Sequence, residues 1–131
     1  MSEESTLKKV EVNTSDLEFL IRAINDDLVF LRKVKLDMKS ARRILTAHYD
    51  LLTMVFHAMG LKHNYMIYSH GDFLVFLLEI KENEISRRFN KFKRLRDRLI
   101  FRGETITPVE ARIIISDIRT LTVSLVKKYL Q

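Results

Sequence analysis

The sequence predicts an all-α protein, built as a four- to five-helix up-down antiparallel bundle. Apolar residues recur at intervals of three and four along most of the chain, which is the spacing of a helix with one buried face. Glycine occurs three times and proline once in 131 residues, and this scarcity favours long helices over a turn-rich sheet. Hydrophobic residues make up 47% of the chain, enough for one continuous core in a single domain.

The first thirteen residues show no period. We therefore expect residues 1–13 to be a flexible lead and residues 14–131 to be the helical domain. Ser15-Asp16-Leu17-Glu18 has the pattern of a capping box, in which the serine and glutamate side chains bind free backbone N–H groups. A stripe at helical spacing follows, and it predicts a first helix that runs to about Lys35. Its members are Leu17, Leu20, Ile21, Ile24, Leu28 and Leu31.

A polar stretch, residues 37–40, predicts the turn before a second helix. Gly60 stands where a helix commonly ends on glycine, and we expect the second helix to end there. The inner stripe of this helix includes one histidine, for which a buried position is the simplest interpretation. The stripe consists of Ile44, His48, Leu51, Leu52, Val55 and Met59.

The third helix is predicted to start near Gly71-Asp72, and its segment FLVFLLEI is apolar on all sides, which is typical of a deeply buried helix. The apolar stripe then continues through a charged region, at Ile85, Phe89, Phe92, Leu95 and Leu99. Because a small bundle offers little support to a rod of about 30 residues, we expect a break near Asn83.

Gly103 is predicted to end the charged helix. Thr107-Pro108-Val109-Glu110 is a second capping box, with proline at the first helical position, where its missing N–H costs nothing. The last helix follows, with an inner face made of Ala111, Ile114, Ile115, Ile118, Leu121 and Leu125.

Several classes of function lack their motifs. The chain has no cysteine, which excludes disulfides and thiolate-bound zinc and favours a cytoplasmic location. The longest apolar run, residues 73–78, is far short of the roughly 20 residues that span a bilayer, and the N-terminus does not resemble a signal peptide, so we expect no membrane association. No two histidines have the spacing of a helical metal site and no glycine-rich phosphate loop is present. We therefore expect no metal and no cofactor.

Positive charge is concentrated in residues 87–102. This segment holds eight basic residues and one acid, Asp97, so it carries +7 against +6 for the whole chain. Such a helix attracts nucleic acid or an acidic protein surface, and arginine suits phosphate oxygens in particular. The alternative is a solvated helix face whose charges are paired with acids such as Glu79, Glu82 or Glu84. In that case Asp97 forms only a local salt bridge.

The segment Leu95-Arg96-Asp97-Arg98-Leu99-Ile100-Phe101-Arg102-Gly103 resembles the signature region of HEPN domains. Arg96 and Asp97 match its arginine and polar residue, and Leu99 and Ile100 match its apolar pair. The order of helices over about residues 15–130 is similar as well. The resemblance implies a helical bundle that is often a homodimer. Many members are metal-independent RNases of toxin–antitoxin or defence systems, and others are partners of small nucleotidyltransferases.

The histidine of that signature falls on Phe101, which cannot transfer a proton. The resemblance therefore implies a non-catalytic binding module, a homodimer that engages RNA or an acidic protein partner through the basic helix. Two other hypotheses stay open: an RNase in which His48, His57 or His70 supplies the imidazole, and a purely structural oligomerisation bundle. The predicted binding residues are Arg87, Arg88, Lys91, Arg94, Arg96, Asp97, Arg98 and Arg102.

Overall fold

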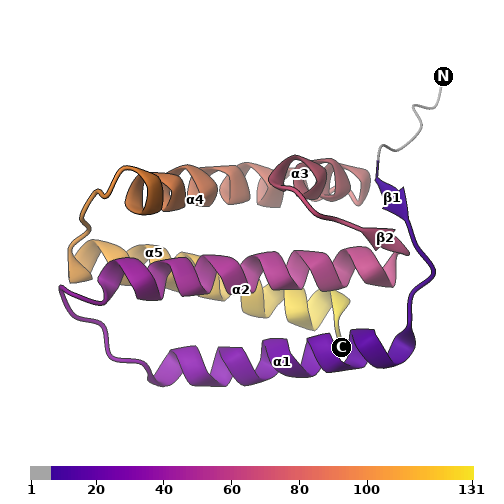
Figure 1. The fold of residues 1–131 in the computed structure, drawn as a ribbon, viewed down its shortest axis with the longest axis horizontal. Helices are drawn as coiled ribbons and strands as arrows, with labels where there is room; N and C mark the ends of the chain where they lie inside the picture. Colours follow the sequence, from indigo (N-terminus) through magenta and orange to yellow (C-terminus); the bar gives the residue numbers. More distant parts are fainter. Residues whose placement is uncertain (1–6) are drawn as a thin grey trace.

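The computed structural model describes residues 7–131, and these residues form an all-α helical bundle with one very short sheet (Figure 1). The predicted fold class is confirmed. The elements in chain order are β1 (Lys8–Lys9), α1 (Thr14–Lys33), α2 (Ala41–Lys62), β2 (Tyr65–Met66), α3 (His70–Glu79), α4 (Asn83–Phe101) and α5 (Pro108–Tyr129). None of these helices combines the length and the apolarity needed to cross a bilayer.

Helix α2 is the centre of the bundle. It contacts α1, α3, α4, α5 and β2, and it lies between α1 and α4 in Figure 1. Its sequence explains this position, because apolar residues occur on more than one side of the helix and would be exposed if only one face were covered. More of its residues are buried than in any other described helix. The most buried helix is therefore α2, and not α3 as the FLVFLLEI segment predicted.

Two hydrogen bonds fix how α5 and α4 run relative to α2, a third joins α5 to α1, and Figure 1 shows α1 antiparallel to α2. Lys62 Nζ donates to the carbonyl oxygen of Tyr129 at 2.9 Å, so α2 and α5 end side by side and run parallel. Arg42 Nη1 donates to the carbonyl oxygen of Leu99 at 3.4 Å, so α4 ends where α2 begins. Arg119 Nη1 donates to the carbonyl oxygen of Leu28 at 3.0 Å and joins α5 to α1. Helices that follow one another along the chain thus run in opposite directions, apart from the short α3.

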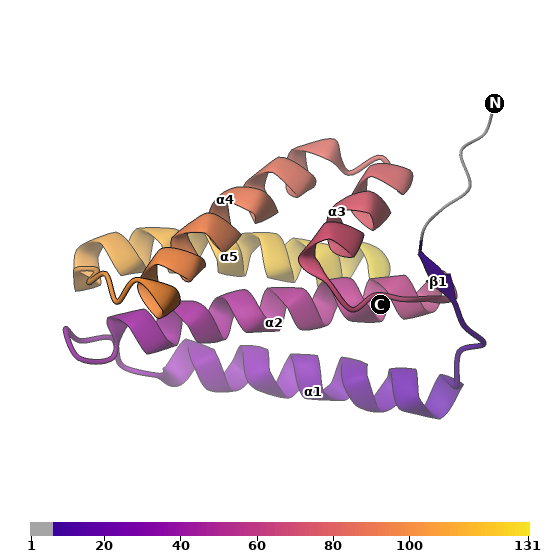
Figure 2. The ribbon, with the colours of Figure 1, turned by 45° about the horizontal axis from the view of Figure 1, so that its top comes forward.

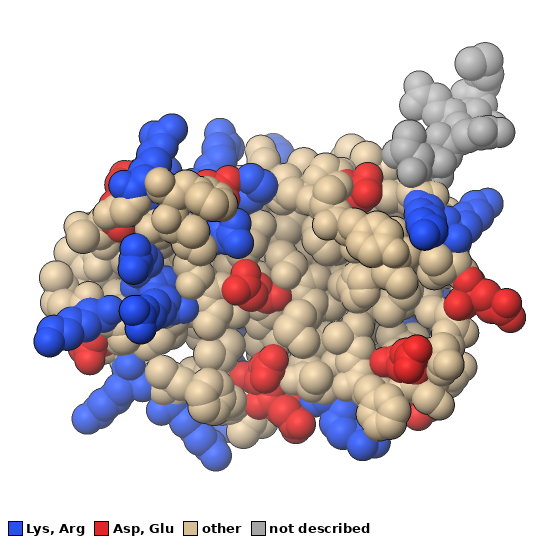
Figure 3. All heavy atoms as spheres, in the orientation of Figure 1, with Lys and Arg blue, Asp and Glu red and all other residues tan. Residues whose placement is uncertain are grey.

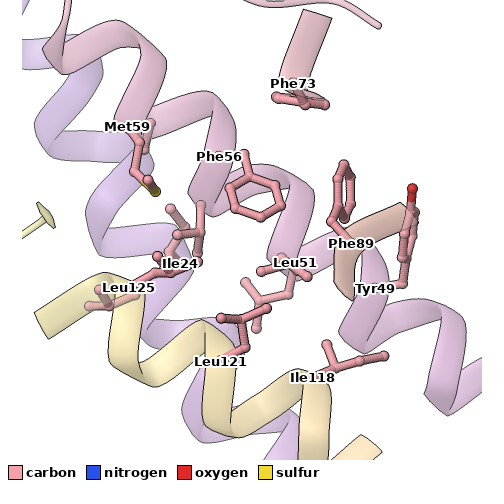
Figure 4. Close-up of a cluster of buried hydrophobic side chains, with 14 of the residues drawn as sticks. Ile24, Tyr49, Leu51, Phe56, Met59, Phe73, Phe89, Ile118, Leu121 and Leu125 are labelled. Atoms are coloured by element: carbon pink, nitrogen blue, oxygen red, sulfur yellow. The ribbon is translucent and has the colours of Figure 1, made fainter. Parts of the chain in front are cut away.

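The core is built around an aromatic cluster beneath α3 and α4. The ring of Phe56, on α2, lies 4.7 Å from that of Phe89 and 5.9 Å from that of Phe73, centroid to centroid. Figure 4 shows these rings next to the aliphatic side chains that α2 and α5 contribute. Because Phe56 and Phe89 are fully buried, each should stabilise the fold by about 1.5–3 kcal/mol through burial alone.

Part of the predicted lead pairs with another segment of the chain. Lys8 and Lys9 pair with Met66 and Tyr65 in the antiparallel β1–β2 sheet, and Leu7 is only 5% exposed. Residues 7–9 therefore pack and pair with other parts of the chain, while residues 1–6 lie outside the described part of the chain and the flexibility of the lead stays a prediction. The pairing joins residues far apart in sequence, which a local pattern does not reveal.

Two of the predicted helix ends are wrong. Helix α1 is capped by Asn13, whose side chain accepts hydrogen bonds from the backbone N–H groups of Ser15 and Asp16, so the capping box at Ser15 does not form. Gly60 lies inside α2, which continues to Lys62, and the left-handed residue after the helix is Asn64 at φ 63°.

Other predicted boundaries are confirmed. The chain breaks between α3 and α4, where Lys81 adopts φ 63°, and Figure 2 shows the sharp bend that results above α2. Gly103 follows α4 at φ 65°, a conformation that glycine adopts without strain. Thr107 caps α5 by accepting a hydrogen bond from the backbone N–H of Glu110 at 3.2 Å.

The reason for glycine at position 60 is close packing. A Cβ atom there would lie 2.6 Å from Ile67 Cδ1 and 3.4 Å from the carbonyl oxygen of Tyr65, and Ile67 is only 2% exposed. The missing side chain lets the segment after α2 fold back against the end of that helix.

We therefore predict that Gly60→Val lowers the free energy of unfolding by about 1–3 kcal/mol, the usual cost of overpacking a core. Urea denaturation followed by circular dichroism measures the change. The matched control is Gly71→Ala, because a Cβ at Gly71 has no neighbour closer than 3.9 Å, and this variant should be as stable as the parent or up to about 1 kcal/mol more stable. Equal stability of Gly60→Val and the parent would contradict the packing argument.

Candidate polyanion-binding helix

Helix α4 has two faces of opposite character. Its inner face packs on α2 through Phe89 and Leu99, which are 0% and 1% exposed. Its outer face carries exposed basic side chains, because the apolar stripe and the charged residues are offset around the helix. On a regular helix with about 3.6 residues per turn, five of these basic residues fall within an arc of about 80°.

We call these five residues the basic ridge. All of them are exposed, and four lie within α4 while the last is its C-cap. Figure 3 shows that most of the lysine and arginine side chains on this face of the molecule gather over α4 and at the end where α2 begins. The ridge consists of Arg87, Lys91, Arg94, Arg98 and Arg102.

Only part of the ridge is neutralised within the chain. Arg87 forms an ion pair with Glu84, one turn earlier, and Arg98 Nε lies 3.9 Å from a carboxylate oxygen of Glu104. Lys91, Arg94 and Arg102 form no ion pair with any residue of the described chain, 7–131. The alternative, in which acids of the chain pair with all the basic residues, is thus correct for Arg87 and, at a longer distance, for Arg98. It is not correct for the other three residues of the ridge.

The acids considered as partners have different positions. Glu82 lies beside Lys128 of α5, with its oxygen 2.9 Å from the Lys128 Nζ atom, and so ties the start of α4 to the end of α5. Of the three glutamates considered, Glu84 alone pairs with the basic segment among the described residues.

Arg96 and Asp97 do not belong to the ridge. Arg96 points away from it, and its guanidinium lies against the Tyr49 ring of α2 at 5.5 Å and the Phe101 ring at 5.7 Å. Asp97 accepts hydrogen bonds from Arg96, at 3.2 Å, and from Lys93, one turn earlier. The interpretation of Asp97 as a local salt bridge is confirmed, and its partners are Lys93 and Arg96. Arg88, the remaining predicted binding residue, is half-buried at the edge of the ridge.

The electrostatics around Arg96 show a cluster that holds α4 on α2. Burial raises the pKa of the Tyr49 hydroxyl to about 12, although the charge of Arg96 opposes this rise, so the hydroxyl stays protonated. Burial also raises the pKa of Asp50, again against the effect of Arg96. Burial opposes the ionisation of Asp97 too, but the hydrogen bonds and charges of Lys93 and Arg96 outweigh it, so its pKa lies below the ordinary value. The sequence gives no signal for Tyr49 or Asp50, because their proximity to Arg96 arises only from the packing of α2 on α4.

One histidine lies beside this helix. His70, at the start of α3, packs against the Phe89 ring at 4.7 Å, and its Nε2 atom is 3.2 Å from the Oδ1 atom of Asn90. Because an amide oxygen accepts, Nε2 is the donor and Nδ1 is the unprotonated nitrogen. Nδ1 is buried and makes no hydrogen bond. Burial lowers the pKa of this imidazole, a lowering that the hydrogen bond to Asn90 partly opposes.

The other histidines lie away from α4. His48 is buried on α2, as its place on the inner stripe predicted. His57 Nδ1 lies 3.2 Å from the carbonyl oxygen of Ile67, and His63 Nδ1 lies 2.9 Å from that of Met59. Within residues 7–131, no group of three or more histidine or acidic side chains is placed to hold a metal ion.

No protein-family model, no curated protein and no solved structure matches this chain. Membership in the HEPN superfamily therefore stays a prediction from residues 95–103 and from the order of the helices.

The Asp97 cluster gives a test of how α4 is held. At neutral pH we expect Asp97→Asn to lower the free energy of unfolding by about 0.5–1 kcal/mol, the range for a partly exposed ion pair. Because the pKa of Asp97 is lowered by folding, its ionised form contributes stability above the ordinary value of 3.8, and this contribution is lost as the pH falls below that value. Urea denaturation at a series of pH values should show the variant and the parent converging in acid.

Asp117→Asn is the matched control, since Asp117 is exposed and forms no ion pair with the described residues. This variant should match the parent at every pH. A deficit of Asp97→Asn that persists unchanged in acid would show that the cluster does not depend on the carboxylate charge.

Proposed function

We propose that this chain is a non-catalytic RNA-binding module, and that the basic ridge of α4 is its contact surface. The observation that carries the proposal is the set of unpaired, exposed cations at Lys91, Arg94 and Arg102. The helix holds these cations near one another despite their mutual repulsion, and a ligand with regularly spaced negative charges lowers that electrostatic energy. A phosphate backbone supplies such charges.

The dimensions of the ridge suit a nucleic-acid strand. At about 1.5 Å per residue, the distance along the helix from Arg87 to Arg102 is about 22 Å, enough for several consecutive phosphates. Phe89 and Phe92 face the core, and the exposed aromatic ring beside the ridge is that of Phe101, which is 74% exposed. The ridge therefore offers a single ring at one end and no continuous platform for base stacking. Binding through the ridge is expected to be electrostatic and weakly dependent on sequence.

The local geometry favours binding over catalysis. A general base needs a nitrogen that can reach the substrate. In His70 one nitrogen is engaged by Asn90 and the other is covered by protein. Arg96, the arginine of the HEPN-like signature, is less than a third exposed and is occupied by Asp97. These two side chains support the packing of α3 and α4. In this proposal the ligand therefore binds the ridge and contacts neither of them.

The homodimer expected from the resemblance is part of this proposal. Large apolar side chains are exposed where α4 ends and α5 begins. Burial of these side chains between two copies of the chain would favour self-association. Phe101 is 74% exposed, Val109 64% and Ile113 62%. The mass in solution, measured by light scattering, would be twice 15.5 kDa for the dimer.

The ridge is tested by reversing two of its charges. We predict that the double variant Lys91→Glu/Arg94→Glu binds a short single-stranded RNA of mixed sequence at least about tenfold more weakly than the parent. The parent itself should lose affinity as salt is raised. If the ridge neutralises three or four phosphates, the logarithmic slope should be about −2 to −3. Fluorescence anisotropy with labelled RNA measures both quantities.

The matched control is Lys33→Glu/Lys127→Glu, which makes the same change in net charge at exposed positions on α1 and α5. This control should bind RNA nearly as well as the parent, and circular dichroism should show unchanged helix content in both variants. Equal loss in the two double variants would mean that net charge and not the ridge governs binding. If the parent does not bind RNA but captures an acidic protein, the ligand of the ridge is a protein and the RNA-binding proposal is wrong.

A second candidate function is a metal-independent RNase, and the position of His70 is the specific observation that favours it. The imidazole lies on the side of α4 that carries Asn90, Lys93 and Asp97, where the charges of Lys93 and Asp97 influence its pKa. This arrangement brings a histidine from α3 next to the HEPN-like segment. Catalysis would require α3 to shift so that the covered Nδ1 atom becomes accessible.

The two functions predict different fates for the RNA. We expect RNA incubated with the purified chain in the presence of a chelator to remain full length on a denaturing gel. If the chain is instead an RNase, the RNA is cleaved, and cleavage disappears in His70→Gln but persists in His57→Gln. Cleavage by both variants would point to a contaminating nuclease.

A further inference from the structure

A second charged feature lies between α1, α2 and α5, and no residue of α4 contributes to it. The end of α1, the following loop, the first half of α2 and the first half of α5 surround a pocket of about 500 Å³. This volume is within the range of small-molecule sites. The lining residues are Leu31, Arg32, Val34, Lys35, Leu36, Ile44, His48, Arg112, Ile115 and Arg119.

The charged residues of this pocket are all of one sign. Arg32, Lys35, Arg112 and Arg119 line it, and the lining contains no aspartate or glutamate. None of the four forms an ion pair with any acid of the described chain, residues 7–131. Four cations around one cavity without a counter-charge raise the energy of the empty pocket, and an anion bound there lowers it.

Arg119 shows this repulsion most directly. It is half-buried on α5 and donates one hydrogen bond, to the carbonyl oxygen of Leu28. Burial lowers the pKa of its guanidinium, and the positive charge of Arg32 lowers it further. The guanidinium has further N–H donors beyond the one used, and the described side chains around it supply no acidic acceptor.

His48 adds a polar group to the floor of the pocket. It is 3% exposed, and burial together with the charge of Arg119 lowers its pKa to about 4, so the imidazole is neutral at physiological pH. The rest of the wall is aliphatic, with Ile44 buried and Leu31 and Ile115 half-buried. The side chains of the pocket therefore offer hydrogen-bond donors and methyl groups, and His48 is the one lining side chain with an acceptor.

This composition restricts the class of ligand. A nucleotide base has N–H groups that need acceptors, and it usually stacks on an aromatic ring, but the lining contains no aromatic residue other than the imidazole of His48. A small inorganic anion would leave the aliphatic wall in contact with water. A hydrocarbon chain with an acidic head group satisfies both parts of the pocket, because the head accepts hydrogen bonds from the arginines and the chain covers the apolar wall.

We propose that this pocket is a binding site for an aliphatic anion, a hydrocarbon chain that ends in a carboxylate or phosphate. The head group is held by Arg112, Arg119 and Arg32, and the chain packs against Leu31, Ile44 and Ile115. The site is independent of the basic ridge, since the two share no residue.

The proposal is tested with the full chain and four probes: decanoate, decyl phosphate, decanol and acetate. Decanoate and decyl phosphate are kept below their critical micelle concentrations, and decanol is kept below its solubility limit. Calorimetry should show saturable one-to-one binding of decanoate or decyl phosphate, and the tighter of the two identifies the head group. Decanol, which lacks the charge, and acetate, which lacks the chain, should bind at least about tenfold more weakly. The NMR signals of the His48 imidazole should shift with the anionic amphiphile.

The variant Arg112→Glu reverses one exposed charge at the pocket and should weaken binding of the anionic amphiphile by at least about tenfold. Lys127→Glu, the same charge change on α5 outside the pocket, should leave binding unchanged, and so should Lys91→Glu/Arg94→Glu on the ridge. Failure of both amphiphiles to bind would overturn the proposal. Equal binding of acetate and decanoate, an equal loss in Arg112→Glu and Lys127→Glu, or unchanged His48 signals would overturn it as well.

Discussion

The enclosure of α2 is the constraint on which the rest of the structure depends. A helix with apolar residues on several sides leaves the water only when neighbours cover each of those sides. Helices α1, α4 and α5 and the short α3 provide this cover. Each outer helix therefore needs an apolar stripe toward α2, whereas packing on α2 does not restrict the residues outside this stripe. Basic residues at such positions form the two charged features of the molecule, the basic ridge and the cationic pocket.

Helix α4 keeps its core contacts and its exposed charges on separate faces. Phe89 and Leu99 hold it on α2, and Arg96 adds a polar contact with the Tyr49 ring of α2, while Asp97 of the same helix binds the Arg96 guanidinium. The motif arginine thus belongs to the attachment of the helix and not to its charged surface. Positive charge close to the core is balanced by Asp97, whereas Lys91 and Arg94 form no ion pair within residues 7–131.

Much of the fold could be predicted because helical periodicity is local information. The break before Asn83, the end at Gly103 and the cap at Thr107 all follow from residues next to one another in the chain. The β1–β2 pairing and the contact of Gly60 with Ile67 could not be predicted, since both depend on which segments meet in space. The same limit applies to the candidate site. The charge of α4 is visible in the sequence, but the separation of Arg96 from the ridge and the cations around His48 depend on packing.

The exposed cations of the ridge make few contacts with the rest of the chain, and this has an evolutionary consequence. Replacing Lys91 or Arg94 by another residue that suits a helix interior breaks no ion pair within the described chain, so selection for folding does not oppose natural variation there. Codon changes that add, remove or move a charge on α4 can therefore alter the charge pattern of this face step by step while the bundle persists. Changes of surface charge of this kind need not pass through unstable intermediates.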